Sequence, residues 1–179
     1  HLDGPNVTIV PIESEELDGV EWVDCYYSEK SGQKVIAQKA MYTKTQTGNG
    51  RFTTLIIPED IDDNLKVESS AVPNGSGLDD SLINGAYFRI TDENTGDVNY
   101  YFYYHINDET LKPAEGVIIG DYTTDATTLV VQSDKNHEVT SVFVVNGSYV
   151  KDSSIGGKYL FKNDEPTTIA FNRSGYFVN

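Results

Sequence analysis

The sequence predicts an all-β protein, a single antiparallel β-sandwich or jelly-roll-like domain of about ten strands with at most short helical turns. Apolar and polar residues alternate with a period of two in short runs along most of the chain, as they do in half-buried strands. Gly, Asn and Asp separate these runs at intervals of about 8 to 16 residues, a spacing typical of sandwiches rather than of βαβ units. A chain of 179 residues is long enough to bury one core of its own.

The N-terminal residues are predicted to form a segment apart from the rest. An alternating strand at residues 7–12 is followed by the acidic linker 13–18, and the next strand spans 20–27. We therefore divide the chain into an N-terminal strand and linker, residues 1–18, and a β-sandwich domain, residues 19–179.

Three hairpins are predicted where turn residues separate two alternating runs. The clearest joins residues 86–91 to 98–106 through Asp92-Glu93-Asn94-Thr95-Gly96-Asp97. The second joins residues 34–45 to 51–57 through Thr47-Gly48-Asn49-Gly50, and the third joins 139–145 to 149–150 through Asn146-Gly147. Residues 142–145 are all apolar, which favours a central strand covered on both faces. Further strands are expected at residues 65–70, 116–122, 128–132, 158–161, 167–171 and 176–178.

Composition excludes some partners and indicates a compartment. With 28 acidic against 13 basic residues, a net charge of −15, the chain repels phosphate backbones, so we expect no nucleic-acid partner. The longest apolar runs fall far short of the roughly 20 residues of a transmembrane helix. The chain opens on His1 rather than Met, as after removal of a signal peptide or as a cut terminus. Together with sequons at Asn6, Asn74, Asn146 and Asn172, this opening favours a secreted or cell-surface glycoprotein.

The tyrosine-rich strand 98–106 is the first candidate binding site. Asn99, Tyr101, Tyr103 and His105 alternate along it, and Tyr87 and Arg89 lie on the neighbouring strand. A flat aromatic surface of this kind stacks against the apolar C–H faces of sugar rings, while amides and charged groups bind the sugar hydroxyls. The alternative is structural, because tyrosines suit half-buried sheets and stabilise hairpins through cross-strand pairs.

Divalent cations are the second candidate ligand. Asp92, Asn94 and Asp97 place oxygen ligands at alternating positions, as calcium prefers, but no glutamate closes a twelve-residue calcium loop. Hairpin turns contain Asp and Asn for local hydrogen bonding alone. We therefore expect no cofactor and keep calcium as the alternative.

No catalytic motif stands out, and we expect a protein that is not an enzyme. Three scattered histidines and one cysteine fit none of the common zinc spacings, and the chain contains no nucleophile elbow or phosphate-binding loop. One enzymatic alternative depends on His1. If it is the native N-terminus, His1 with His105 or His137 could chelate copper as in copper-dependent polysaccharide monooxygenases.

The N-terminal strand suggests assembly. Val7, Ile9, Val10 and Ile12 belong to an apolar segment that resembles a strand donated to another subunit, as in a pilus or similar filament. The predicted function is therefore a non-enzymatic, surface-displayed structural and adhesion module that contacts proteins or glycans and assembles into a homo-oligomer or fimbrium-like filament. A glycan-binding module and a viral structural protein are the alternatives.

Overall fold

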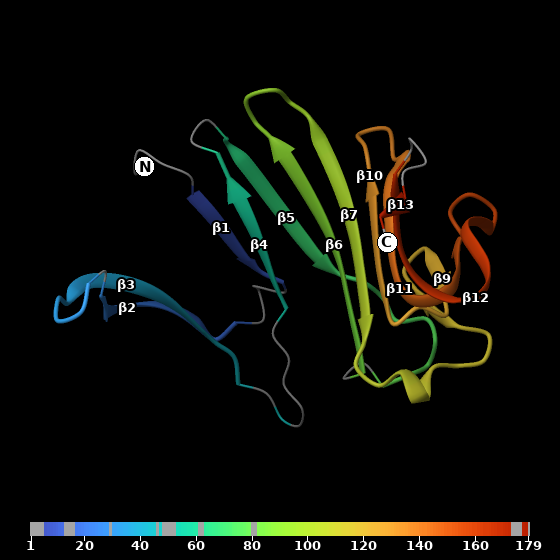
Figure 1. The fold of residues 1–179 in the computed structure, drawn as a ribbon, viewed down its shortest axis with the longest axis horizontal. Coiled ribbons are helices and arrows are strands. Elements are labelled where there is room, and N and C mark those ends of the chain that lie inside the picture. The colour runs from blue at the N-terminus through green and yellow to red at the C-terminus, as the bar shows by residue number, and fades with distance from the viewer. Residues whose placement is uncertain are drawn as a thin grey trace. The chain divides into compact units, whose positions relative to one another are not determined.

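The computed structural model describes residues 6–12, 17–28, 30–45, 47, 53–60, 63–79, 82–172 and 177–178. These residues form strands β1 to β13 and the short 3-10 helix η3 (Glu109–Leu111), and every strand pairing is antiparallel (Figure 1). The all-β, antiparallel prediction is confirmed. The chain separates into two compact units, residues 1–12 with 52–179, here called the body, and residues 13–51, here called the hairpin unit.

The unit boundaries differ from the division predicted after residue 18. Strand β1 (Asn6–Pro11) belongs to the body, because it pairs along its length with β4 (Thr54–Glu59) in a two-stranded sheet. The chain then enters the hairpin unit at residue 13 and returns to the body at residue 52. Residues 1–5 and 13–16, which include most of the predicted acidic linker, lie outside the described residues.

The main sheet of the body has nine strands. Its path runs β13-β12-β11-β10-β7-β6-β5, and the short strands β8 and β9 join it because β9 pairs with β11. The strands are β5 (Leu65–Ala71), β6 (Ile83–Asp92), β7 (Val98–Ile106), β8 (Val117–Ile119), β9 (Tyr122–Thr124), β10 (Thr128–Ser133), β11 (Val139–Asp152), β12 (Lys158–Asn172) and β13 (Phe177–Val178).

The predicted hairpin over residues 86–106 is confirmed as β6 and β7. Its turn is closed by the Asp92 N–H, which donates to the Asp97 carbonyl at 2.9 Å, and Gly96 adopts the positive φ of 75° that the turn needs. Four residues lie between Asp92 and Asp97. Thr91 therefore pairs with Val98, and even-numbered residues of β7 pair with odd-numbered residues of β6.

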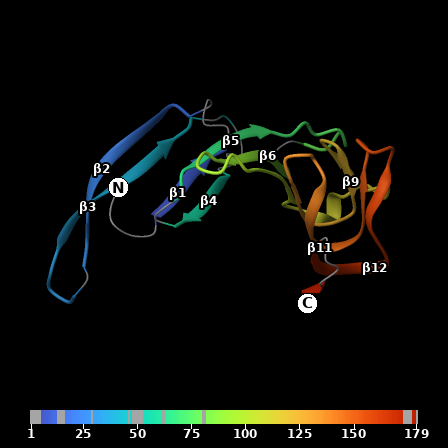
Figure 2. The same ribbon diagram turned by 90° about the horizontal axis from the view of Figure 1, so that it is seen from above.

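The predicted hairpin at Asn146-Gly147 is wrong. Strand β11 continues through these residues, and the turn-forming pair makes a β-bulge instead, with Asn146 at a φ of 49° and a register shift between Val144 and Gly147. The bulge lets the first half of β11 pair with β10 and its second half pair with β9. The sheet therefore curls (Figure 2). The β8–β9 turn comes to lie beside β6, where Asp121 forms hydrogen bonds with the Tyr87 hydroxyl.

The curl encloses the main hydrophobic core on one face of the sheet. Among its fully buried members are Tyr104, Ile106, Val117, Leu129, Val131, Val142, Val144 and Val150. Residues 142–145 are not covered on both faces as predicted, because Phe143 is 40% exposed between the buried Val142 and Val144. The face that carries this core is called the concave face below, and the opposite face the convex face.

A smaller core lies on the convex face. Ile12 packs with Ala86 and Phe88, and Leu55 with Tyr101 and Tyr103 completes the cluster. The strands β1 and β4 thus place apolar side chains against the β6–β7 part of the sheet. The described body is a curled sheet with apolar packing on both of its faces.

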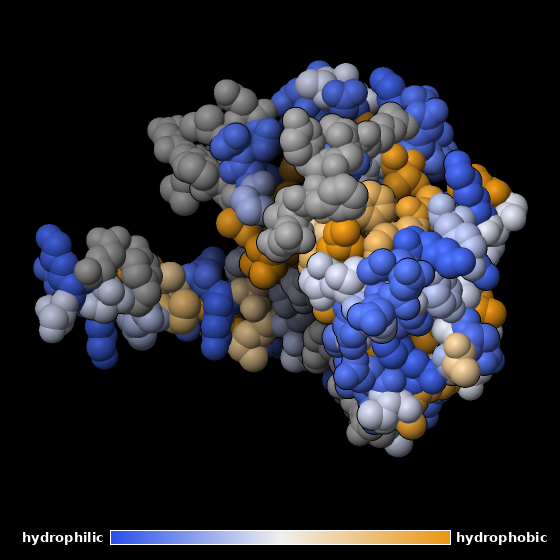
Figure 3. Space-filling view, turned by 45° about the vertical axis from the view of Figure 1, so that its right-hand side comes forward, coloured by the Kyte–Doolittle hydropathy of each residue, from blue (hydrophilic) through white to orange (hydrophobic). Residues whose placement is uncertain are grey.

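The hairpin unit consists of β2 (Gly19–Tyr27) and β3 (Val35–Thr43), paired from Gly19 with Thr43 to Tyr27 with Val35. Apolar and hydrophilic residues alternate along it (Figure 3). The predicted hairpin between residues 34–45 and 51–57 does not form, because β3 pairs with the preceding strand and β4 pairs with β1. Both strands of β2–β3 have nine residues, and their loop contains Gly32 at a φ of 86°. Residues 48–50 of the predicted turn lie outside the described residues.

Candidate functional site

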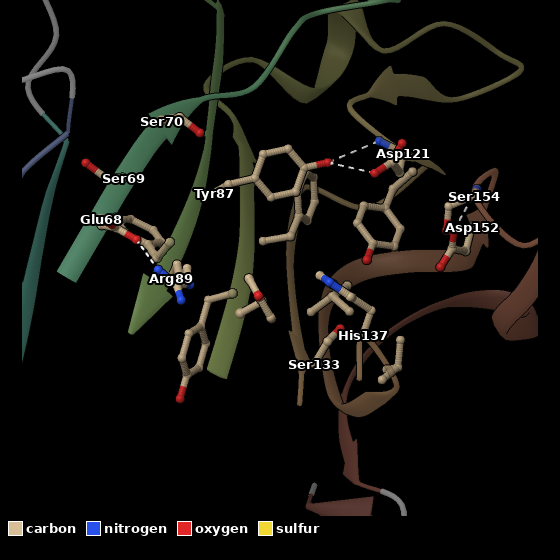
Figure 4. A pocket seen from close by; sticks show the side chains of 17 residues that line it. Glu68, Ser69, Ser70, Tyr87, Arg89, Asp121, Ser133, His137, Asp152 and Ser154 are labelled. Carbon is tan, nitrogen blue, oxygen red and sulfur yellow. Dashed lines mark hydrogen bonds and ion pairs between the residues drawn. The ribbon is translucent and has the colours of Figure 1, made fainter. Parts of the chain in front are cut away.

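A cleft of about 510 Å³ opens on the concave face of the body (Figure 4). Strands β5, β6 and β7 form one wall, and residues from the β8–β9 turn, the β10–β11 turn and the end of β11 form the other. The volume lies within the range of small-ligand sites in proteins, about 300 to 1,000 Å³. The cleft is the strongest candidate for a binding site in the described body.

Aromatic rings line the floor of the cleft. Tyr87 and Phe102 have ring centroids 5.4 Å apart, and the rings of Phe102 and Tyr122 lie 4.5 Å apart, both pairs tilted. At the mouth, Tyr100 stacks on His137 at 4.5 Å with an interplanar angle of 26°. Each ring presents an apolar surface held in place by its neighbour, and such preorganised surfaces are what ligand rings stack on.

Tyr87 connects the aromatic floor to a carboxylate. Its hydroxyl donates to Asp121 Oδ2 at 3.3 Å and accepts from the Asp121 backbone N–H, also at 3.3 Å. Burial raises the pKa of the Tyr87 phenol, and the Asp121 charge adds to this effect. The tight β8–β9 turn allows the approach, since Gly120 has a φ of 54° and a Cβ there would lie 2.5 Å from the Tyr87 oxygen.

An ion pair lies at the β5 side of the cleft. Arg89 Nη1 donates to Glu68 Oε2 at 2.6 Å, and Lys66 Nζ lies 3.0 Å from Glu68 Oε1. The Arg89 hydrogen bond, and after it the one from Lys66, lowers the pKa of Glu68. The Glu68 hydrogen bond raises the pKa of Arg89. Both groups are therefore charged at neutral pH, and both line the cleft.

A buried carboxylate lies on the opposite side. Asp152 is only 5% exposed, and its Oδ1 accepts from the Ser154 N–H at 2.8 Å and from the Ser154 hydroxyl at 2.5 Å. The Ser133 hydroxyl lines the same cleft near His137. Figure 4 shows Glu68 and Arg89 on one side of the cleft and Asp152 with Ser154 on the other. Three carboxylates and one guanidinium thus surround an aromatic floor.

The predicted tyrosine surface is split by the sheet. Asn99, Tyr101, Tyr103 and His105 lie on the convex face, whereas Tyr87 pairs with Phe102 and Arg89 pairs with Tyr100 on the concave face. The prediction that Tyr87 and Arg89 share a face with the other four residues is wrong. Because four residues lie between Asp92 and Asp97, odd-numbered residues of β6 pair with even-numbered residues of β7. The prediction needed the register that is one residue different, and a change of one residue moves every side chain of a strand to the other face.

The convex-face residues make structural contacts. Gln132 Nε2 donates to the Tyr101 hydroxyl at 3.2 Å and to Asn99 Oδ1 at 3.3 Å, and His105 Nδ1 lies 2.9 Å from Thr128 Oγ1. Burial raises the pKa of Tyr101 and of Tyr103. An apolar groove of about 490 Å³ between β4 and these tyrosines is lined almost wholly by carbon. It lacks the charged groups that the concave cleft provides.

The calcium candidates lie in the β6–β7 turn. Asp92 Oδ1 accepts from the Asn94 N–H at 2.8 Å, and Oδ2 accepts from the Thr95 hydroxyl at 2.9 Å. The Asn94 N–H, followed by the Thr95 hydroxyl, lowers the pKa of Asp92. Asp97 lies 3.9 Å from Lys135 Nζ. The Asp92 carboxylate closes the turn, and no group of three His, Cys, Asp or Glu suited to a metal occurs among the described residues.

The copper hypothesis pairs His1 with either His105 or His137. His105 is on the convex face and His137 lines the concave cleft, with a φ of 60°. His1 lies outside the described residues, so the pairing of His1 with either histidine stays a prediction.

The predicted glycosylation sites differ in environment. Asn146 and Asn172 are exposed. Asn74 is partly buried, with Nδ2 donating to the Leu78 carbonyl at 2.7 Å and Oδ1 accepting from the Ser76 N–H at 3.0 Å. The Asn6 side chain lies outside the described residues, although its backbone belongs to β1. Glycosylation stays a prediction. Of the three sequon asparagines whose side chains are described, Asn146 and Asn172 are exposed, and Asn146 Nδ2 donates to Glu109 Oε2 at 2.7 Å.

The predicted assembly strand is paired within its own chain. Val7 and Ile9 are 57% and 50% exposed on the outer face of the β1–β4 sheet, while Ile12 is buried beside Phe88. Val10 pairs with Leu55. Donation of this segment to another subunit would require exchange of the β1–β4 pairing.

The sequence analysis missed half of the concave cleft. Glu68, Asp121 and the Asp152–Ser154 pair come from three separate parts of the chain, and no local spacing joins these three parts. One signal was present. The alternation of Tyr100 and Phe102 with Tyr101 and Tyr103 placed aromatic residues on both faces of one strand, so that either face could carry an aromatic surface.

No protein-family model matches the chain, and no curated protein matches its sequence. In the part of the chain that the structure describes, no helix has the length and apolar character to cross a bilayer.

Proposed function

We propose that this protein is a non-enzymatic, surface-displayed adhesion module that binds a neutral saccharide in the concave cleft. The observation that carries the proposal is the aromatic floor of Tyr87, Phe102 and Tyr122, bordered by carboxylates and by Arg89. Saccharides need both features, since their ring C–H faces are apolar and their hydroxyls pair with planar charged groups. The proposed ligand is a glycan, as in the prediction from the sequence, but its site lies on the opposite face of β7.

The charge of the cleft favours a neutral ligand. Glu68, Asp121 and Asp152 outnumber Arg89, whose charge is already paired with Glu68 at 2.6 Å. A sulfated or sialylated sugar would meet uncompensated carboxylates, and like charges in a partly enclosed site cost binding energy. The carboxylates instead accept hydrogen bonds from neutral sugar hydroxyls.

Binding should be tested on an array of neutral and anionic glycans, followed by titration calorimetry with the best neutral hit. We expect binding to fall at least about tenfold in Tyr87→Ala and in Asp121→Asn, because each removes either a stacking surface or a hydrogen-bond acceptor. Tyr159→Ala is the matched control, because Tyr159 is 41% exposed and does not line the cleft. Absence of any glycan hit, or equal loss in the control, contradicts the proposal.

A further inference from the structure

The hairpin unit exposes an apolar face that its own two strands cannot cover. Trp22 is 69% exposed, Tyr26 66% and Ile36 68%. Tyr26 pairs directly with Ile36 in the ladder, and Trp22 points to the same side four residues earlier along β2. A two-stranded hairpin is at best marginally stable alone in water. Asp24, which accepts a hydrogen bond from Gln38 Nε2 at 3.4 Å, separates Trp22 from Tyr26 on this face. Exposed apolar surface bordered by polar residues in this way marks a surface that binds a partner.

The second half of the hairpin unit is basic, although residues 13–51 together have seven acidic and five basic residues, a net charge of −2. Residues 30–51 contain five basic and no acidic residues, whereas the rest of the chain has 28 acidic and eight basic residues, a net charge of −20. Lys30 and Lys34 flank the loop between β2 and β3, and Lys34 Nζ lies 5.6 Å from the centre of the Tyr26 ring. The apolar face therefore ends beside two lysines, and the loop 28–34, which also contains Glu29, has a net charge of +1. Its partner should be apolar with an acidic end.

The body of the same protein presents such a surface. On the outer face of the β1–β4 sheet, Val7, Ile9 and Ile56 are 57%, 50% and 61% exposed, and Ile9 pairs with Ile56. Strand β4 then ends at Glu59, and Asp60, Asp62 and Asp63 follow in the sequence. Asp60 and Asp63 are exposed. An apolar strip thus ends in an acidic segment, whose charge is opposite to that of Lys30 and Lys34 beside the β2–β3 loop.

We propose that the hairpin unit of one copy binds the outer β1–β4 face of a second copy. Trp22, Tyr26 and Ile36 cover the Val7, Ile9 and Ile56 strip, and Lys30 and Lys34 lie against the acidic segment after β4. The contact is heterologous, since two different surfaces meet, so it generates rings or filaments. It requires no exchange of the β1–β4 pairing and does not depend on the saccharide cleft.

Sedimentation velocity and light scattering of the full chain test the proposal. We expect a concentration-dependent increase in mass that weakens as ionic strength rises from about 0.05 M to about 0.5 M, because exposed charge pairs are screened. The variants Trp22→Ser and Lys30→Glu/Lys34→Glu should each raise the dissociation constant about tenfold or more, since buried aromatics and complementary charges dominate such contacts. Lys135→Glu/Lys158→Glu is the control for a double charge reversal on the body and should leave self-association unchanged.

A mixing experiment separates binding to a second copy from folding back onto the same chain. Trp22→Ser keeps the β1–β4 face intact, and Ile56→Asp keeps the hairpin unit intact. Each variant alone should be monomeric, while an equimolar mixture should form a one-to-one complex. If Trp22→Ser unfolds the hairpin, Lys30→Glu/Lys34→Glu still tests the contact, because exposed lysines are not needed for folding. A wild-type protein that stays monomeric at all concentrations, or a mixture that remains monomeric, overturns the proposal.

Discussion

Tyr104 is the most deeply buried tyrosine of the body, with no exposed surface, and no described residue accepts or donates a hydrogen bond at its hydroxyl. Leaving a buried hydroxyl without a partner costs about 1 to 3 kcal/mol. We therefore expect Tyr104→Phe to keep or raise the free energy of unfolding, by up to about 1 kcal/mol, because the ring stays and the unpaired oxygen is removed. Urea unfolding followed by fluorescence measures this change in the free energy of unfolding.

A second substitution, Tyr104→Ala, separates the contribution of the ring from that of the hydroxyl. Tyr104→Ala removes the ring as well and should lower the free energy of unfolding by about 3 to 5 kcal/mol through the cavity it leaves. If Tyr104→Phe is destabilising by a similar amount, the hydroxyl has a partner that stabilises the fold, and the account of this core position is wrong.

The Tyr87 phenol reports on the neighbouring Asp121. Burial is the main reason that the Tyr87 pKa is raised, and the Asp121 carboxylate raises it further. Asp121→Asn should therefore lower the Tyr87 pKa while leaving it above its ordinary value. Ultraviolet titration of the variant against Asp121→Asn/Tyr87→Phe isolates this one tyrosine. An unchanged Tyr87 pKa would show that the two side chains do not meet as Figure 4 draws them.

At the scale of elements, the bulge in β11 decides how the sheet curls. Gly147 lies against Ala126, so that an added Cβ would be 2.6 Å from the Ala126 Cβ and 2.9 Å from a Val144 methyl. Gly147→Ala must push these buried groups apart, and overpacking of this kind costs about 1 to 3 kcal/mol. Differential scanning calorimetry should show a lower Tm. Gly19→Ala is the control, since its nearest neighbour would be an ordinary 3.5 Å away.

Asp125 accepts hydrogen bonds from the backbone that follows the same bulge. Its Oδ1 accepts from the Ser148 and Tyr149 N–H groups at 2.7 and 3.0 Å, and Oδ2 lies 2.5 Å from the Ser148 hydroxyl. Hydrogen bonds to a charged acceptor contribute about 1.5 to 3 kcal/mol. Asp125→Ala should therefore lower the free energy of unfolding by at least about 1.5 kcal/mol in chemical denaturation. Asp164→Ala, an exposed acid on β12, should have little effect.

Most strands followed from the alternation, but how they pair did not. The strand predicted at 116–122 is divided into β8 and β9, and the strands predicted at 158–161 and 167–171 are one strand, β12. The β6–β7 hairpin could be predicted because Asn94 and Gly96 lie between two long alternating runs. The Asn146-Gly147 pair carries the same turn signal and forms a bulge, because strand β9, which is distant in sequence, offers the second half of β11 a partner. Local turn chemistry does not distinguish these outcomes, since tertiary pairing selects between them.

At the scale of the whole molecule, the candidate site could likewise be predicted only in part, because it depends on how the strands pair. Tyr87 and Phe102 of its aromatic floor lie on one hairpin, which was visible as a tyrosine-rich strand, although the face was assigned wrongly for Tyr87 and Arg89. The third ring, Tyr122, lies on β9. The acidic half of the site depends on the curl, which brings Asp121 and Asp152 opposite Glu68. Contacts between residues more than 30 positions apart are set by sheet topology, and the period of a sequence pattern carries no information about them.

Tyrosine burial predicts how the stability of the whole body depends on alkaline pH. Burial raises the pKa of Tyr87, Tyr101, Tyr103, Tyr104, Tyr122 and Tyr149. In the unfolded chain these phenols ionise near pH 10, so above that pH the unfolded state loses protons that the folded state retains. The stability that their burial provides is complete below about pH 10 and declines as the pH rises toward the folded-state pKa values.

Urea unfolding at about pH 8 and about pH 11 should therefore show a clear loss of stability at the higher pH. The tyrosine absorbance at 295 nm should rise in two stages, exposed phenols first and the buried ones together with unfolding. Tyr104→Phe removes one buried phenol and should reduce the pH-dependent loss, whereas Tyr159→Phe alters a ring that is 41% exposed and should leave the loss unchanged. Ionisation of all twelve tyrosines in a single step near pH 10, with the fold intact, would contradict the burial that the curled sheet imposes.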